Sequence, residues 1–270
     1  MSIAPPSAAA MKRVLILSYF HYKNFGDRLG VPIINALLPA DVHVVHAPLN
    51  FSYIPEGKFD LMILGLGQSL NTPAIINPEL DRLLDRIPNV IGIFGTQYKS
   101  QYRTAMPPGR FDALIGRLTT WWARYQSDVE EFGGGRATVR HMGDWLVSAF
   151  PMAEPRFDKR LIIGPEAVDI ELPLDRVIQR IQAYRLVDSA RLHTLLCALT
   201  SAAEVSYTEQ REAEGGEVSG KFDAMLTDIF GRTFPERTPF QVDRDAVLRY
   251  KLMVEANMAA LRRQIVELLG

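Results

Sequence analysis

Short, fully apolar segments alternate along this chain with longer segments that have helical periodicity. Apolar runs of strand length occur within residues 12–20, 41–48, 60–67 and 89–95, and amphipathic stretches separate them. Strands that are apolar on both faces must be covered on both faces, which is the environment of a parallel sheet flanked by helices. The pattern therefore predicts an α/β fold built on parallel sheets.

The same alternation continues into the second half of the chain, with one interruption. Two more strand-like segments follow, and then the polar, proline-bearing stretch 152–158 breaks the pattern. Such a stretch commonly forms a domain boundary or a hinge. We therefore expect an N-terminal α/β domain at residues 12–150 and a smaller C-terminal α/β domain at residues 151–270, which ends in a long amphipathic helix. Residues 1–11 are expected to form a disordered leader.

Composition narrows the class of protein. The chain has 270 residues and a formal net charge of −1. This balance gives no general attraction to nucleic acid, so none is expected as a partner. The single cysteine, Cys197, excludes an intramolecular disulfide. No stretch has the character of a signal peptide or a membrane span, which indicates a cytoplasmic protein. Peripheral association with the inner face of a membrane stays open.

Four polar clusters follow predicted strands, and ligands of parallel sheets bind beyond the carboxyl ends of the strands. The first is NFGD at residues 24–27, in which Gly26 permits a tight turn and Asp27 can cap the next helix. The second is GLGQS at residues 65–69, whose glycines would let backbone amides approach a ligand closely. The third is GTQY at residues 95–98.

The fourth cluster is SARLH, at the start of an apolar run. A strand at 185–188 followed by Ser189 as N-cap puts Arg191 and His193 in the first turn of a helix. Positive charge is unfavourable there by roughly 0.3–1 kcal/mol, because it opposes the helix dipole. A bound anion would remove that conflict, and the imidazole could exchange protons with it. We interpret the cluster as an anionic-ligand site, and a buried structural role for His193 stays open as the alternative.

Other common chemistries lack their motifs. His43 and His46 fall on opposite faces of one predicted strand, and no two histidines have metal-ligand spacing on a helix, so no metal site is expected. The chain has neither a GxSxG nucleophile elbow nor a phosphate loop of the form GxxxxGKS or GxxxxGKT. Residues 65–70 lack the third glycine of a dinucleotide fingerprint, which disfavours NAD. No cofactor is expected.

The order of these motifs resembles that of the polysaccharide pyruvyl transferase family. The matching segments are NFGD, GLGQS, IGIFG, ARYQSDVEEFG, GDW, SARLHTLLCAL, AEVSY and GKFDAMLTDIFG, which together span about residues 12–231. That family is similar in fold to glycosyltransferases with two facing domains. The resemblance therefore implies two Rossmann-like domains with parallel sheets in a GT-B-like arrangement, here with a shortened second domain.

The resemblance also implies an activity. Characterised members move the enolpyruvyl group of phosphoenolpyruvate onto a sugar, forming a cyclic ketal. The implied function is a pyruvyl transferase of exopolysaccharide biosynthesis, which acts on a polysaccharide or its lipid-linked precursor. Arg191 and His193 would then bind the donor and act in catalysis, with Asp27 as base for the sugar hydroxyl. The candidate donor- and substrate-binding residues are Asn24, Gly26, Gly65, Gly67, Gln68, Ser69, Gly95, Thr96, Gln97, Arg124, Ser127, Ser189 and Lys221.

Two other functions stay open. A glycosyltransferase of the same fold would use a nucleotide-activated sugar, and a noncatalytic glycan-binding protein of polysaccharide assembly would use neither donor. The expected partner is a glycan or a lipid-linked saccharide in each case. Trp121, Trp122 and Tyr98 are candidates for stacking on the faces of a sugar ring.

Overall fold

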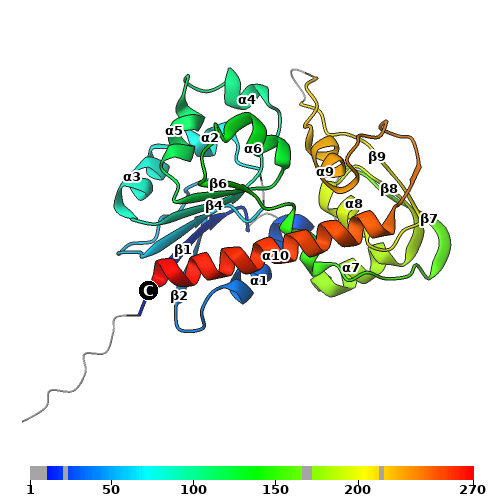
Figure 1. Cartoon of the computed structure of the whole chain (residues 1–270), viewed down its shortest axis with the longest axis horizontal. Helices are drawn as coiled ribbons and strands as arrows, with labels where there is room; N and C mark the ends of the chain where they lie inside the picture. The colour runs from blue at the N-terminus through cyan, green and yellow to red at the C-terminus, as the bar shows by residue number, and fades with distance from the viewer. Residues whose placement is uncertain (1–10, 21–23, 68, 166–171, 213–215) are drawn as a thin grey trace, which may run out of the picture.

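In the computed structural model, the chain folds around two β-sheets that share a long C-terminal helix (Figure 1). The structure describes residues 11–20, 24–67, 69–165, 172–212 and 216–270. The expected leader, apart from Met11, and the candidate Gln68 lie outside the described residues. Among the residues described, no helix is both long and apolar enough to cross a membrane.

The first sheet has six parallel strands in the order β2-β1-β3-β4-β5-β6. The strands are β1 (Arg13–Ser18), β2 (His43–Pro48), β3 (Leu61–Leu64), β4 (Val90–Phe94), β5 (Thr120–Ala123) and β6 (Val139–His141). Both faces of β1 are buried, with Val14 and Ile16 in one core and Leu15 and Leu17 in the other. This two-sided burial confirms the α/β class predicted from the apolar runs.

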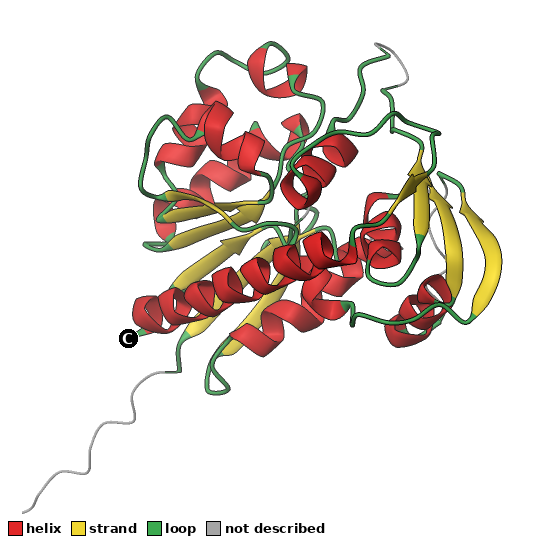
Figure 2. Cartoon of the chain, turned by 45° about the vertical axis from the view of Figure 1, so that its right-hand side comes forward, coloured by secondary structure: helices red, strands yellow, loops and turns green. Residues whose placement is uncertain are grey.

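Helices cover this sheet on both faces (Figure 2). They are α1 (Phe25–Leu37), α2 (Thr72–Ile75), α3 (Pro78–Arg86), α4 (Ser100–Arg103), α5 (Arg110–Gly116) and α6 (Gln126–Phe132). Local signals set their starts, as where Asn77 accepts a hydrogen bond from the Glu79 amide at 2.9 Å and caps α3. Strand β1 lies between β2 and β3, so the strand order changes direction at β1. Such a switch in strand order opens a crevice beyond the carboxyl ends of β1 and β3, and a pocket lies there.

The second sheet is smaller and mixed, in the order β10-β9-β8-β7. Its elements are β7 (Phe157–Ile163), α7 (Leu174–Gln182), β8 (Tyr184–Ser189), α8 (Leu192–Leu199), β9 (Glu204–Tyr207), α9 (Lys221–Phe230) and β10 (Phe240–Gln241). Strands β7, β8 and β9 are parallel, but β10 runs antiparallel to β9, so the expectation of a purely parallel second sheet is wrong. The Val242 amide donates a hydrogen bond to the carbonyl oxygen of Ala203, the residue before β9, and Asp243 caps the C-terminal helix directly afterwards. The chain must therefore run back along β9 before that helix begins.

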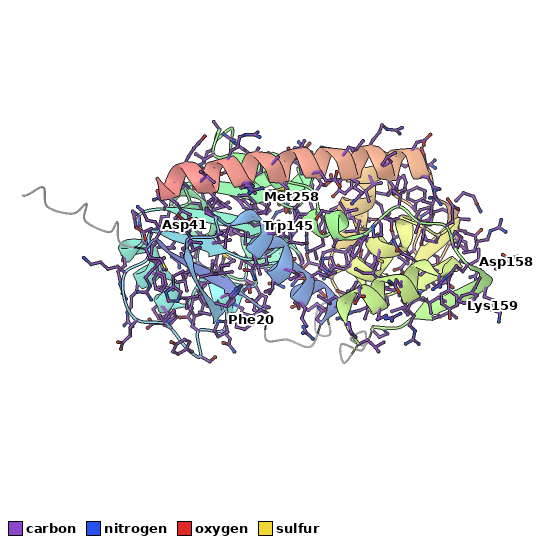
Figure 3. The ribbon with its side chains drawn as sticks, turned by 90° about the horizontal axis from the view of Figure 1, so that it is seen from below. Phe20, Asp41, Trp145, Asp158, Lys159 and Met258 are labelled. Carbon is purple, nitrogen blue, oxygen red and sulfur yellow. The ribbon has the colours of Figure 1, made fainter. Side chains whose placement is uncertain are left out.

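The last helix, α10 (Arg244–Leu269), runs along both halves of the molecule (Figure 1). The first half is the six-stranded sheet with its helices, and the second half is the four-stranded sheet with its helices. It packs on α9, on α1 and on the 3-10 segment η1 (Trp145–Ala149) that follows the first sheet. Near its C-terminus, Gln264 accepts a hydrogen bond from Trp122 Nε1 at 2.9 Å. Seen from below, Trp145 lies near the middle of the molecule under α10, whereas Asp158 lies at the outer end of the second half (Figure 3).

The first sheet ends at His141 and the second begins at Phe157, on either side of the predicted boundary. One hydrophobic core nevertheless extends from the first sheet through η1 and α10 to the second sheet. The division into domains at residues 12–150 and 151–270 therefore stays a prediction.

Candidate functional site

A pocket of about 290 Å³ lies between the carboxyl ends of strands from both sheets. The first half contributes residues that follow β1, β3, β4 and β5, and the second half contributes residues that follow β8 and β9. The lining residues are Tyr19, Asn24, Phe25, Gly26, Asp27, Ser69, Asn71, Gln97, Arg124, Arg191, Leu192, His193, Thr194, Gln210 and Lys221. All four polar clusters contribute to this lining, so the fold brings them to one place.

The NFGD cluster forms the first turn of α1. Asn24 is the N-cap, because its side chain accepts a hydrogen bond from the Gly26 amide at 3.3 Å and the helix begins at Phe25. Asp27 lies within the first turn, where its carboxylate accepts a hydrogen bond from Asn24 Nδ2 at 2.9 Å. The predicted capping by Asp27 is therefore wrong, since Asn24 caps the helix earlier. Asn24, Gly26 and Asp27 all line the pocket.

The SARLH cluster connects β8 to α8. Ser189 is the last residue of β8, and its hydroxyl accepts a hydrogen bond from the Arg191 amide at 3.1 Å. Arg191 occupies the N-cap position, and α8 begins at Leu192 without a side-chain cap. The predicted N-cap at Ser189 is wrong, because its hydroxyl is used within the connecting turn. His193 lies in the first turn of α8 as predicted, whereas Arg191 precedes the helix.

His193 lies against α1 and so joins the two halves of the molecule. A Cβ built on Gly26 would lie 1.8 Å from His193 Nδ1, which means that the edge of the imidazole rests on the Gly26 backbone. On the other side of the ring, His193 Nε2 lies 3.4 Å from Asp144 Oδ2. Gly26 is inside α1, so it permits this close approach and not the tight turn predicted for it.

Asp144 is a residue of this site for which the sequence indicates no role, although it stands in the segment GDW. It is the N-cap of η1, and its carboxylate accepts a hydrogen bond from the Leu146 amide at 3.3 Å. Burial alone would raise the pKa of this carboxyl, but the proximity of His193, with help from Arg124, holds the pKa below its ordinary value. Its position just after β6, at the carboxyl edge of the sheet, is the signal that could have indicated it.

Arg124 is the buried cation of the first half, with 2% of its surface exposed. Its Nη2 donates a hydrogen bond to Ser69 Oγ at 2.9 Å, and its Nη1 donates to the carbonyl oxygen of Gly67. Gly95 makes room for this side chain, because a Cβ there would lie 2.8 Å from Arg124 Nε. Arg124 and Ser69 line the pocket, whereas Gly95 is not among the described lining residues.

The glycines of GLGQS serve packing. The amide of Gly65 donates a hydrogen bond to the carbonyl oxygen of Leu17 at 2.8 Å, and that of Gly67 to the carbonyl oxygen of Ile93 at 2.8 Å. A Cβ on Gly67 would lie 2.6 Å from Trp145 Nε1, so a side chain there would displace the indole. The amides of Gly65 and Gly67 are therefore not open to a ligand, because residues of the neighbouring strands already accept hydrogen bonds from both of them. Gln68 lies outside the described residues, so the approach of other amides of this cluster stays a prediction.

The third cluster contributes Gln97 to the lining. Thr96 is buried, and both its amide and its hydroxyl donate hydrogen bonds to the Asp128 carboxylate. Ser127 lies inside α6, whose N-cap is Tyr125. Neither Thr96 nor Ser127 is among the lining residues described.

Lys221 is the first residue of α9 and reaches the pocket from the second half. Its Nζ donates a hydrogen bond to Gln210 Oε1 at 2.7 Å. Burial, together with the positive charges of Arg124 and Arg191, lowers the pKa of Lys221 to about 8 against the opposing effect of nearby carboxylates. Near neutral pH this ammonium is therefore charged but close to losing its proton.

The predicted stacking of Trp121 and Trp122 on a sugar is wrong. Trp121 is 0% exposed and Trp122 is 3% exposed, and they pack on opposite faces of the first sheet. Both faces of β5 are covered, which leaves neither ring free for a ligand. Tyr98 follows β4, and its amide donates a hydrogen bond to the carbonyl oxygen of Ser219 at 3.1 Å. Its ring is not among the described lining residues.

The pocket as a whole favours an anion. Arg124, Arg191 and Lys221 bond to backbone carbonyls or to neutral side-chain oxygens, and within the described residues no carboxylate is in ion-pair contact with them. The uncapped amino end of α8 adds the positive end of a helix dipole. In the described part of the chain, no group of three or more His, Cys, Asp or Glu side chains is placed to hold a metal ion.

Several lining residues carry no signal in the sequence. Asn71 caps α2 through a hydrogen bond from the Ala74 amide at 3.1 Å, and Gln210 contacts Lys221. Tyr19 and Thr194 complete this group. None of them belongs to a predicted cluster. They are identified only because the fold places them beside the other lining residues.

Neither the models of known protein families nor the curated proteins compared with this chain include a match. No family membership is established, and the function has to be inferred from the pocket and from the order of the motifs.

Proposed function

We propose that the protein is a transferase that moves the pyruvyl group of phosphoenolpyruvate onto a sugar as a cyclic ketal. The observation that carries this proposal is the convergence of Arg124, Arg191 and Lys221 on one small pocket without a carboxylate ion-pair partner among the described residues. Phosphoenolpyruvate carries a phosphate and a carboxylate on a three-carbon frame, so it requires several cations within a small volume. The motif order that resembles the pyruvyl transferase family supports the same donor.

The size of the pocket favours a small donor over a large one. Its volume of about 290 Å³ lies just below the range of roughly 300–1,000 Å³ that is typical of ligand pockets. A nucleotide-activated sugar would add a base, a ribose and a diphosphate, and the base would need an apolar surface. Most of the described lining is polar or charged. The nucleotide-sugar glycosyltransferase is therefore the less well supported alternative.

The proposed reaction assigns a role to each charged side chain. Arg191 and the first amides of α8 bind the phosphate, and Arg124 and Lys221 bind the carboxylate. His193 donates a proton to C3 of the donor, and positive charge develops at C2. A sugar hydroxyl then forms a bond to C2 while Asp27 accepts its proton.

The remaining bonds change at the same carbon. The bond between C2 and the phosphate oxygen breaks, and inorganic phosphate leaves while the same cations stabilise its charge. A second hydroxyl of the sugar bonds to C2 and closes the ketal, and its proton leaves with the phosphate. The proton taken up by Asp27 replaces, through solvent, the one that His193 gave to C3, and the second sugar proton leaves on hydrogen phosphate. The protons therefore balance, and the step requires no redox partner.

The proposal extends to the arrangement of the two halves and to the acceptor. The pocket is lined from both sheets, which supports a GT-B-like arrangement of two Rossmann-like units with the substrates bound between them. The acceptor is a glycan or a lipid-linked saccharide. Under this proposal the reaction takes place in the cytoplasm, at the inner face of the membrane when the acceptor is lipid-linked.

Thermal unfolding and calorimetry with phosphoenolpyruvate test the donor. We expect the donor to raise the Tm of the wild-type protein, and Arg191→Met to abolish most of that rise. Arg160→Met is the matched control, because Arg160 pairs with Asp188 and Glu204 in the second sheet and is not a described lining residue. Stabilisation by a nucleotide sugar but not by phosphoenolpyruvate would favour the glycosyltransferase. Glycan binding that is indifferent to Arg191→Met and His193→Ala, without a donor response, would favour the noncatalytic function.

A further inference from the structure

His193 and Asp144 each present one buried polar atom that lacks a hydrogen bond. These atoms are His193 Nε2 and Asp144 Oδ2, and they lie 3.4 Å apart. Unpaired buried polar groups are rare, because each one loses its hydration without compensation. The distance is slightly longer than a normal hydrogen bond, and catalytic hydrogen bonds are often long in a free enzyme and shorten when substrate binds.

The Asp144 carboxylate is held in a fixed position from two sides. Its Oδ1 accepts a hydrogen bond from the Leu146 amide at 3.3 Å, which leaves Oδ2 directed at the imidazole. Its own amide donates a hydrogen bond to Tyr250 Oη of α10 at 2.6 Å. Gly143 permits this contact: its φ is +82°, and a Cβ there would lie 2.5 Å from Val254 Cγ2.

Helix α10 also binds the backbone on both sides of Asp144. Asn257 Nδ2 donates hydrogen bonds to the carbonyl oxygens of His141 at 3.1 Å and Met142 at 3.2 Å. Lys251 Nζ donates to the carbonyl oxygens of Val147 at 3.0 Å and Ser148 at 3.1 Å. The segment that carries Asp144 is therefore anchored along the helix that runs past both halves of the molecule.

Arg124 does not compete for the Asp144 carboxylate. It is close enough to favour the ionised form, but its hydrogen bonds go to Gly67 and Ser69. His193 is thus the group toward which the free oxygen of Asp144 points.

We propose that Asp144 is the positioning residue of His193 and that Tyr250 holds Asp144 in place from α10. Asp144 keeps the proton of the neutral imidazole on Nε2, so that Nδ1, the ring nitrogen on the side of Gly26, is the one left to exchange protons with a ligand. The contact and the tautomer stand on the geometry alone, whereas the use of Nδ1 as the acid rests on the function proposed above.

The tautomer of His193 can be measured directly from the ¹⁵N chemical shifts of its ring nitrogens at a pH where the ring is neutral. We expect the wild-type proton on Nε2. In Asp144→Asn, the Leu146 amide still requires an acceptor, so the amide oxygen stays at the Oδ1 position and the NH₂ group faces Nε2. Two donors cannot share that contact, so the proton should move to Nδ1. A wild-type proton on Nδ1, or an unchanged Nε2 proton in Asp144→Asn, would overturn the proposal.

Tyr250→Phe tests whether Tyr250 holds Asp144 in place. It also tests the tautomer of His193 if Asp144→Asn fails to fold. Without the hydroxyl, the Asp144 amide loses its acceptor, and we expect a measurable share of the Nδ1–H form. Tyr207→Phe is the matched control, because Tyr207 Oη bonds to Asp223 and Phe234 within the second half. Equal tautomer ratios in Tyr250→Phe and the wild type would refute the role of Tyr250.

Kinetics separate this inference from the proposed reaction. If phosphoenolpyruvate is the donor, Asp144→Asn should lower kcat by about 10²–10⁴-fold with a small change in KM, since the acid is misoriented while the cations are intact. A changed tautomer in a protein that does not use phosphoenolpyruvate would refute the proposed function and leave the positioning role standing. A changed tautomer with an unchanged kcat for this donor would refute the use of Nδ1 as the acid.

Discussion

The contact between Gly26 and His193 leads to a sharp prediction for Gly26→Ala. The new Cβ would lie 1.8 Å from Nδ1 and 2.6 Å from both Cγ and Cε1 of His193. These atoms belong to the imidazole of a short side chain on a helix that is packed in the core. The imidazole therefore cannot avoid the methyl group by a small rotation. Either the ring leaves Asp144 or the first turn of α1 moves away from α8.

The expected effect on stability is small because two terms oppose each other. Overpacking a core position costs typically about 1–3 kcal/mol. Replacing glycine by alanine inside a helix stabilises it by roughly 0.5–1 kcal/mol. We therefore expect the free energy of unfolding to fall by about 0–2.5 kcal/mol, which leaves a folded protein. The effect on the site should be larger, because both the position of His193 and the entrance between the two halves change.

Urea unfolding, calorimetry with phosphoenolpyruvate and the ¹⁵N signals of His193 measure these effects together. Gly116→Ala is the control, because a Cβ at this exposed helix position meets no atom within 4 Å. We expect the control to equal or exceed the wild type in stability and to bind the anion normally. Wild-type affinity together with unchanged His193 ring signals in Gly26→Ala would refute the steric argument.

Three further predictions concern two cations of the pocket and one carboxylate outside its described lining. Arg191→Met should weaken binding of phosphoenolpyruvate by at least about tenfold, as expected for a charged hydrogen bond worth roughly 1.5–3 kcal/mol, and calorimetry would show it. Because the pKa of Lys221 is lowered to about 8, its charge is present below that pH and lost above it. Anion affinity should therefore fall as the pH rises from about 7 to about 9, and a pH series should show that this dependence disappears in Lys221→Met. Glu217 accepts hydrogen bonds from the Ser100 amide at 3.1 Å and from its hydroxyl, and Glu217→Gln keeps one of them at most. This change should weaken anion binding severalfold while the free energy of unfolding changes by less than about 1 kcal/mol, since the contact anchors the segment whose Ser219 amide donates a hydrogen bond to the Gln210 carbonyl oxygen at 2.7 Å. Equal affinity would contradict that coupling.

The α/β class and the place of the site were predictable because they depend on local patterns. A strand such as residues 13–18 must be covered on both faces, since every one of its central side chains is apolar. Polar residues that end such strands gather at one edge of the sheet. Asn77 as a cap and His193 in the first turn of a helix also follow from local chemistry.

The errors concern residues whose roles depend on partners distant in sequence. Gly67 is needed for the approach of Trp145, and its amide is used by Ile93, so the glycine pattern alone misleads. Ser189 and Asp27 both have the chemistry of a cap, but the turn geometry gives the capping positions to other residues. The antiparallel β10 depends on where α10 must begin, which no pattern within residues 240–241 encodes.

By itself, then, the sequence determined the class of fold, the alternation of its elements and the polar clusters at the ends of its strands, because burial and hydrogen bonding within a short segment dictate them. Only the tertiary structure decided that Arg124, Arg191 and Lys221 meet in one pocket and that Asp144 faces His193. These juxtapositions join segments that are tens of residues apart, and they depend on the packing of the two sheets against η1 and α10. The charge of each group can be read along the chain, but its partner is set by packing.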